Sequence, residues 1–151
     1  MKLATTRRWL IALTISAVPL ALGVESLLRW LLLPADFDEL RTWLEPPMTT
    51  AAWWLMGLCA VVGVACVLAQ ARWCRRSLSR LVPGAGDEAA ERACIGVFIV
   101  TASLAQGPAL LASLTFLLGA RLLPVLLAVG WSTSSVTIQA LRIKPLASGH
   151  G

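Results

Sequence analysis

Residues 46–71 read PPMTTAAWWLMGLCAVVGVACVLAQA and contain no charged side chain. The hydrocarbon core of a bilayer is about 30 Å thick, and a helix that rises about 1.5 Å per residue crosses it with about 20 apolar residues. This stretch therefore predicts a transmembrane helix over about residues 50–71. The whole chain shares its character, because 58% of the 151 residues are hydrophobic and 14% are charged, whereas soluble domains carry about 25% charge.

Three further apolar segments reach the same length, and we expect them to span the membrane too, at about residues 9–33, 93–119 and 122–141. The sequence thus predicts an all-α fold: a single polytopic membrane domain over residues 1–151, with four transmembrane helices in two antiparallel hairpins. An outer loop over residues 34–49 and a cytoplasmic loop over residues 72–92 complete this organisation. Between the last two spans, Gly119 is the expected C-cap, and Pro124 stands near the next helix start.

The first span begins like a cleavable signal peptide. The basic residues Lys2, Arg7 and Arg8 precede an apolar stretch that reaches Ala21-Leu22-Gly23, which resembles a cleavage site. The apolar pattern then resumes at Leu27 and continues to Leu33. We therefore expect residues 1–23 to be retained as part of a membrane-spanning helix.

Basic residues set the expected orientation. Ten of the 13 lie at the N-terminus, in the loop of residues 72–92 or at the C-terminus, which four spans place on one side. The positive-inside rule then puts both termini and this loop in the cytoplasm, with a bacterial inner (cytoplasmic) membrane as the expected location. Tryptophans agree with this, because they gather near both predicted membrane surfaces: Trp30, Trp43, Trp53 and Trp54 outside, and Trp9 and Trp73 inside.

Both loops contain helix signals. In the outer loop, apolar residues recur at helical spacing, which predicts a short amphipathic helix on the membrane surface: Phe37, Leu40, Trp43 and Leu44. In the cytoplasmic loop, the turn residues Val82-Pro83-Gly84-Ala85-Gly86 precede Asp87, a candidate N-cap, with Glu88 and Glu91 in the first turn. The third helix is thus expected to begin before it enters the bilayer.

No residue set points to a cofactor or a metal. The four cysteines, Cys59, Cys66, Cys74 and Cys94, include no CxxC pair. We therefore expect all four to be reduced, to form no disulfide and to pack as small apolar residues. The only histidine is His150, and one histidine in a tail cannot build a metal or haem site. The sequence therefore predicts a non-enzyme without cofactors.

Glu25 and Arg29 are opposite charges within the first span, and their i,i+4 spacing places them on one helix face. Charge in hydrocarbon is costly, so an intramembrane carboxylate is a candidate proton or cation site. The structural alternative is that the two residues satisfy each other and that Arg29 reaches the outer headgroups.

The third span carries small and polar residues around Gln106, Gly107 and Pro108. Proline at this position frees the carbonyl of Leu104, which another helix, a water or an ion could satisfy. Gln106 is either part of a polar path or, as we favour, a hydrogen-bonding contact between closely packed helices.

Residues 104–110, Leu-Ala-Gln-Gly-Pro-Ala-Leu, resemble the carboxylate-bearing segment of rotor-ring proteolipids, subunit c of rotary ATP synthases. The resemblance covers about seven residues of the 151 and departs from the family at Gln106, which stands where those proteins carry the ion-binding acid. The family's hairpin loop is cytoplasmic, whereas both hairpin loops are expected outside here. The chain is more similar to small bacterial membrane proteins that share this pattern.

Hydroxyl and amide side chains also follow Trp131 in the fourth span, where they could line a polar path or pack against the third span or a partner subunit: Ser132, Ser134, Thr137 and Gln139. The second span contains a weak small-residue seam that includes Gly57 and Gly63 but has no GxxxG motif.

The positive charge of the chain, +5 at pH 7, lies beside apolar segments and so indicates membrane contact, not nucleic acid. Four arginines after the second span are candidate lipid-headgroup contacts: Arg72, Arg75, Arg76 and Arg80. The sequence favours a non-catalytic accessory or structural subunit that packs with the bilayer, with other membrane subunits or with itself. The alternative is an oligomeric transporter or channel that uses Glu25, Gln106 or the hydroxyls of the fourth span.

Overall fold

The computed structural model describes residues 2–32, 37–80 and 86–143, and within these ranges the chain is helical and forms no β-strand. Four helices follow one another: α1 (Lys2–Leu32), α2 (Phe37–Ser79), α3 (Asp87–Leu117) and α4 (Leu122–Leu141). By length and composition, each of them can cross a membrane. The prediction of an all-α chain with four such helices is confirmed, while predictions that concern Pro34, Pro83-Gly84 and His150 lie outside the described residues.

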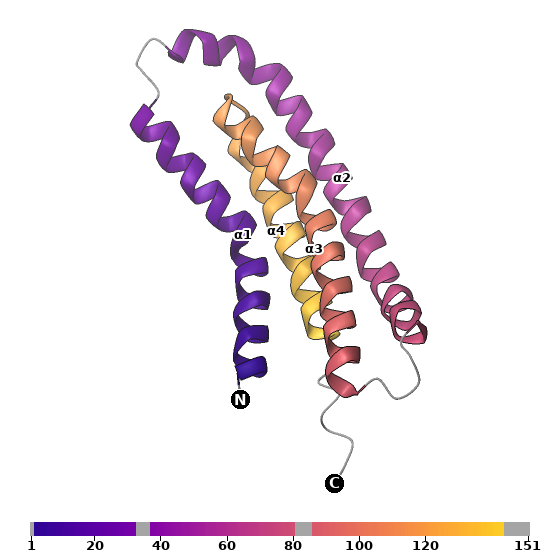
Figure 1. Cartoon of the computed structure of the whole chain (residues 1–151). Helices are drawn as coiled ribbons and strands as arrows, with labels where there is room; N and C mark the ends of the chain where they lie inside the picture. Colours follow the sequence, from indigo (N-terminus) through magenta and orange to yellow (C-terminus); the bar gives the residue numbers. More distant parts are fainter. Residues whose placement is uncertain (1, 33–36, 81–85, 144–151) are drawn as a thin grey trace.

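The helices form an elongated bundle with α3 and α4 at its centre (Figure 1). Both α1 and α2 pack against these two helices, whereas no described Cα atom of α1 lies within 8 Å of one in α2. The expected α3–α4 hairpin is therefore present, but α1 and α2 run antiparallel without packing on each other. The starts of α1 and α3 and the ends of α2 and α4 lie at the same end of the bundle (Figure 1).

Helix α2 is longer than its predicted span, because parts of both neighbouring loops belong to it. A separate surface helix was expected in residues 34–49, but one helix runs from Phe37 to Ser79 with Pro46 and Pro47 inside it. Prolines bend a helix without necessarily ending it, and Thr50 Oγ1 donates to the Pro46 carbonyl at 3.0 Å. Figure 1 shows the first turns of α2 curving over the end of the bundle.

The start of α3 differs from the prediction by one residue. Gly86, not Asp87, is the N-cap, and no side chain caps the helix. The extended backbone of Gly86 turns its carbonyl toward the first turn, where it accepts from the Ala89 amide at 2.9 Å. Asp87 is the first helical residue.

The turn between α3 and α4 depends on Gly119, whose φ of +115° favours glycine. Leu118 is the C-cap, and the Gly119 amide donates to the Phe116 carbonyl at 3.1 Å. At the same end, Arg121 Nε donates to Glu45 Oε1 at 2.8 Å and ties this turn to α2. Gly119 was predicted to be the C-cap itself, but it follows the C-cap by one residue, and Pro124 lies in the first turn of α4.

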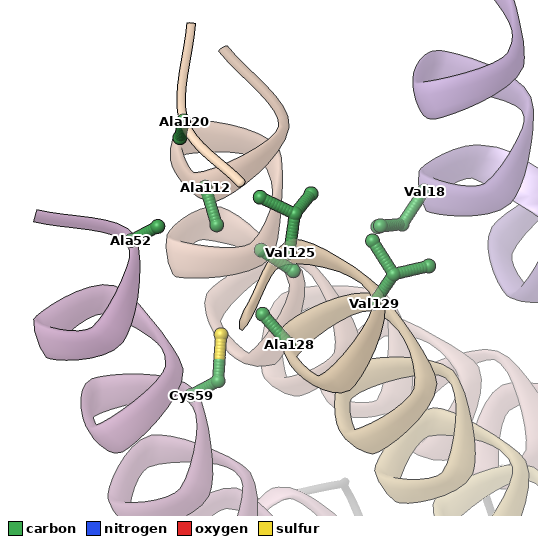
Figure 2. Close-up of a cluster of buried hydrophobic side chains, with 9 residues drawn as sticks. Val18, Ala52, Cys59, Ala112, Ala120, Val125, Ala128 and Val129 are labelled. Atoms are coloured by element: carbon green, nitrogen blue, oxygen red, sulfur yellow. The ribbon is translucent and has the colours of Figure 1, made fainter. Parts of the chain in front are cut away.

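Small residues fill the interior, and large apolar residues cover the outside. One buried cluster joins all four helices, and Figure 2 labels most of its members: Val18, Ala52, Cys59, Ala109, Ala112, Ala120, Val125, Ala128 and Val129. A second lies toward the other end: Cys66, Phe98, Ala102, Ala105 and Val136. By contrast, Trp30 and Leu141 are 80% and 79% exposed. This distribution is typical of helices that pack within lipid.

Gly63 of α2 lies close against α4. A β-carbon added there would lie 2.6 Å from Ser135 Oγ and 3.1 Å from Trp131 Nε1. Gly57, on the same helix, has no such neighbour within 4 Å. The predicted seam of small residues on α2 therefore makes contact at Gly63 and not at Gly57.

We expect Gly63→Ala to lower the unfolding free energy by about 1–3 kcal/mol, because the added methyl group pushes α4 away. Gly57→Ala is the matched control, with the same chemical change on the same helix, and should be neutral or slightly stabilising. Unfolding in mild detergent, followed by circular dichroism, measures both variants. An equal effect of the two substitutions would contradict the close contact.

Candidate polar sites between the helices

Gln106 is buried and connects α3 to α1. Its Nε2 atom donates to the backbone carbonyl of Thr14 in a short hydrogen bond. Thr14 directly precedes Ile15, whose carbonyl loses its helical donor because Pro19 has no backbone N–H. The amide thus adds a donor in the part of α1 where the backbone hydrogen bonding is interrupted. This geometry supports a contact between helices more directly than an open polar path.

Pro108 lies inside α3, which continues through it. The Leu104 carbonyl was expected to need a partner, and the neighbouring carbonyl of Ala105 receives one from α4. Ser132 Oγ donates to Ala105 O at 3.2 Å, and both residues are fully buried. A serine on α4 thus stabilises the turn of α3 that precedes the proline.

Glu25 faces α3. The hydroxyl of Ser113 lies 3.0 Å from Glu25 Oε1 and 2.8 Å from the Leu110 carbonyl, so its single proton can serve either acceptor. Glu25 Oε2 is buried and has no hydrogen-bond partner in the part of the chain that the structure describes. The carboxylate therefore retains an unused acceptor within a predicted membrane span.

Arg29 reaches the C-terminal end of α3. Its Nη1 atom donates to the Phe116 carbonyl at 3.3 Å, and Cζ lies 4.6 Å from the centroid of the Phe116 ring. The guanidinium gains from the negative end of the helix dipole and from the aromatic face. Arg29 thus contacts α3 within the protein, whereas the structural alternative placed it at the lipid headgroups. Glu25 and Arg29 both dock α1 onto α3.

The other polar residues of α4 separate into two groups. Ser134 and Thr137 donate to backbone carbonyls of their own helix, those of Gly130 and Thr133, each at 2.8 Å. Gln139 is fully buried, and neither polar atom of its side chain has a partner among the described residues. Its side chain is therefore one of the least satisfied polar groups in the interior.

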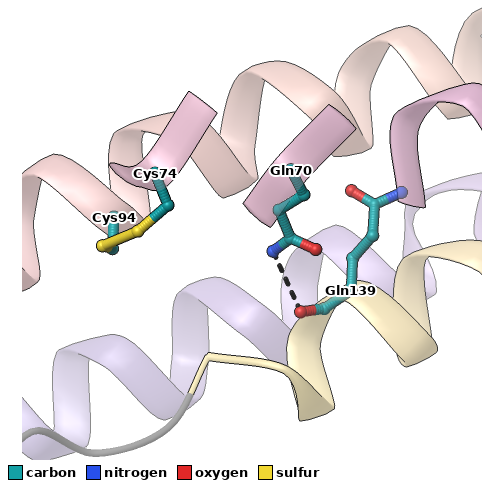
Figure 3. Close-up of a disulfide and its surroundings, with 4 residues drawn as sticks. All are labelled: Gln70, Cys74, Cys94 and Gln139. Atoms are coloured by element: carbon teal, nitrogen blue, oxygen red, sulfur yellow. Dashed lines mark hydrogen bonds between the residues drawn. A yellow bond between two sulfur atoms is a disulfide. The ribbon is translucent and has the colours of Figure 1, made fainter. Parts of the chain in front are cut away.

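Gln70 of α2 lies next to Gln139, and sequence reasoning missed it. Its Nε2 atom donates to the backbone carbonyl of Gln139 at 3.1 Å, as Figure 3 shows. Gln70 is the only amide residue in the charge-free stretch of residues 46–71. A single amide in an apolar span is the sequence signal that could have marked Gln70 as a candidate. The two glutamines join α2 to α4 near the end where the arginines gather.

The structure contradicts the prediction of four reduced cysteines. Cys74 of α2 and Cys94 of α3 form a disulfide, with a Cα–Cα distance of 5.2 Å (Figure 3). The prediction was wrong because α2 continues beyond its expected end at residue 71 and brings Cys74 beside Cys94 of α3. Cys59 and Cys66 are free and buried, as expected of small hydrophobes.

The four arginines predicted at the headgroups face different surroundings. Arg75 lines a pocket of about 260 Å³ with Glu91, Cys94 and Arg142. Arg76 and Arg80 line a separate groove of about 450 Å³ between α2 and α3. Arg72 belongs to neither lining and is exposed.

Comparison with known proteins adds no relative. The chain matches no protein-family model, no curated protein and no solved structure. Within the described ranges, no group of three or more His, Cys, Asp and Glu side chains could hold a metal ion. The resemblance of residues 104–110 to rotor-ring proteolipids stays a prediction, and any proposal of function rests on the geometry above.

We expect Ser132→Ala to lower the unfolding free energy in mild detergent by about 1 kcal/mol, because it removes a donor between α4 and α3. Ser134→Ala deletes the same hydroxyl from an exposed position that bonds only within α4, and it should change stability by less than about 0.5 kcal/mol. A thermal unfolding series compares the two. A larger effect of Ser134→Ala would contradict the assigned role of Ser132.

We expect two of the four cysteines to react with a maleimide after the protein, purified without reductant, is denatured, because the Cys74–Cys94 bond protects the other two. Adding a reductant before labelling should raise the count to four. Mass spectrometry of the labelled chain measures this, and Cys74→Ser should give three labels without reductant. Four labels on the untreated protein would contradict the disulfide.

Proposed function

We propose that this chain is a small non-catalytic membrane protein that acts as an accessory or structural subunit, packed in a membrane complex or with copies of itself. One observation carries the proposal: the exposed apolar surface of α1 contains a stripe with the spacing of a helix–helix seam. Leu20, Val24, Leu27 and Leu31 follow one another at intervals of four, three and four residues, and each is at least 54% exposed. This spacing fits the side chains of a second helix.

The loose attachment of α1 supports the same proposal. In its most apolar window, 6% of the residues are buried, compared with 44% in α4. Polar contacts through Glu25, Arg29 and Gln106 join α1 to α3. Val18 is the one described residue of α1 among the buried members of the two clusters. Since α1 does not contact α2, a partner helix can lie along its exposed stripe without displacing a packed neighbour.

The expected membrane and orientation belong to this proposal. The three chain segments that hold most basic residues adjoin the same end of the bundle, at the starts of α1 and α3 and the ends of α2 and α4 (Figure 1). This clustering supports a bacterial inner membrane with that end in the cytoplasm. No enzymatic activity is proposed.

A second candidate function, an oligomeric transporter, is favoured by the geometry of Glu25. Its Oε2 atom is buried without a hydrogen-bond partner in the described part of the chain. The Ser113 hydroxyl lies 3.0 Å from Oε1 and 2.8 Å from the Leu110 carbonyl, and when it donates to that carbonyl both carboxylate oxygens are open to a ligand. Such a carboxylate can carry a proton or bind a cation.

We expect the tagged protein, purified in mild detergent from native membranes, to retain a membrane partner or a second copy at fixed stoichiometry. Leu20→Ala with Leu27→Ala should weaken this association about tenfold, which is ~1.4 kcal/mol. Leu104→Ala with Leu111→Ala is the matched control, because these leucines of α3 are also spaced by seven residues and similarly exposed. Quantitative mass spectrometry and light scattering measure the association.

Reconstitution separates the two candidate functions. Under the accessory proposal, the pure chain moves no ions in liposomes, and Glu25→Gln leaves its association unchanged. Proton or cation flux that Glu25→Gln abolishes would replace that proposal with the transporter. A lone monomer in detergent, or an equal loss of partner in both leucine variants, would overturn the assigned seam.

A further inference from the structure

The groove between the end of α2 and the start of α3 has a charged half and an apolar half. It encloses about 450 Å³, and Arg76 and Arg80 lie on its α2 wall. Arg76 lies in the last turn of α2 and Arg80 directly follows its end at Ser79, and both side chains line the groove. Neither guanidinium forms an ion pair with any described residue, whereas Arg29, Arg121 and Arg142 are each bound to other parts of the protein.

The apolar half of the groove lies deeper in the predicted membrane. Trp73 stands one turn before Arg76, and Val97 and Val100 line the opposite wall on α3. Gly96, on the α3 wall, opens onto space, because a β-carbon added there would meet nothing within 4 Å. From Arg80 toward Val100 the lining changes from guanidinium groups to an indole and then to aliphatic side chains, as a lipid changes from its headgroup to its acyl chain.

The Cys74–Cys94 disulfide holds the two walls together beside this groove. Cys74 follows Trp73 directly, and Cys94 follows Ala93, which also lines the groove. The covalent bond fixes the separation of α2 and α3 at this level, so the lining does not depend on helix packing alone.

We propose that this groove binds one membrane phospholipid with a net negative headgroup. The phosphate lies between Arg76 and Arg80, where two guanidiniums can donate several charge-assisted hydrogen bonds. The hydroxyl of Ser77, which also lines the groove, is a further donor. An acyl chain lies along Gly96, Val97 and Val100. A soluble anion would leave this apolar half uncovered, and a zwitterionic headgroup would place an ammonium beside the two arginines. The proposal holds whether the protein is an accessory subunit or a transporter.

Native mass spectrometry of the full-length protein tests this proposal, with phosphatidylglycerol and phosphatidylcholine of equal chain length offered in competition. We expect one retained phosphatidylglycerol and a preference for it of about tenfold. Arg76→Gln with Arg80→Gln should abolish the preference. Arg72→Gln with Arg75→Gln removes the same charge from the same helix outside the groove and should retain it.

The apolar half has its own test. Gly96→Leu fills the groove without changing a charge and should lower phosphatidylglycerol retention about tenfold, whereas Gly57→Leu, at an equally open position on α2, should not. Circular dichroism checks that each variant keeps its helices. An equal loss of preference in both arginine pairs, unchanged retention in Gly96→Leu, or displacement of the lipid by millimolar inorganic phosphate would each overturn the proposal.

Discussion

Lipid tails are as apolar as leucine, so membrane helices gain little from burying large apolar side chains against one another. What remains is close contact between small residues and hydrogen bonding between helices. Both occur along one stripe of α3, whose buried members recur at helical spacing: Ala102, Ala105, Ala109 and Ala112. The alanines let the neighbouring helices approach, and this proximity lets Gln106 reach a carbonyl of α1 and Ser132 reach a carbonyl of α3. Larger residues along the stripe would remove the packing and the hydrogen bonds together.

The helices could be predicted from sequence because a membrane span depends on local apolar length, and α4 has its predicted bounds, residues 122–141. The helix ends outside the bilayer were harder to predict, since Pro46 and Pro47 suggest a break that the structure bridges as a bend. The packing of α1 on α3 and α4 was not predictable either. A hairpin of consecutive spans is the simplest arrangement, and the contacts that override it join residues far apart in the chain, such as Glu25 and Ser113.

The candidate polar residues were found because amides and charges are rare in apolar spans, but their partners were not. Composition marks Gln106 and Gln139 as unusual, yet only the packed structure separates them. Gln106 has an acceptor on α1, whereas the Gln139 side chain has no partner among the described residues. Cys74 and Cys94 are a similar case. Their separation of 20 residues carries no signal, and they meet only because α2 continues to Ser79 and α3 starts at Asp87.

The disulfide and the charge distribution favour opposite orientations of the chain in the membrane. The arginines at this end favour the cytoplasm, where thiols are normally kept reduced, while a lasting disulfide favours an oxidising compartment. The conflict concerns the redox state of the two cysteines, whose Cα atoms lie 5.2 Å apart. With this end in the cytoplasm, the pair would be open in a reducing cell, and small-residue contacts near Gly63 would hold α2 in place without it. Oxidation would then lock α2 to α3 beside the lipid groove without rearranging the fold.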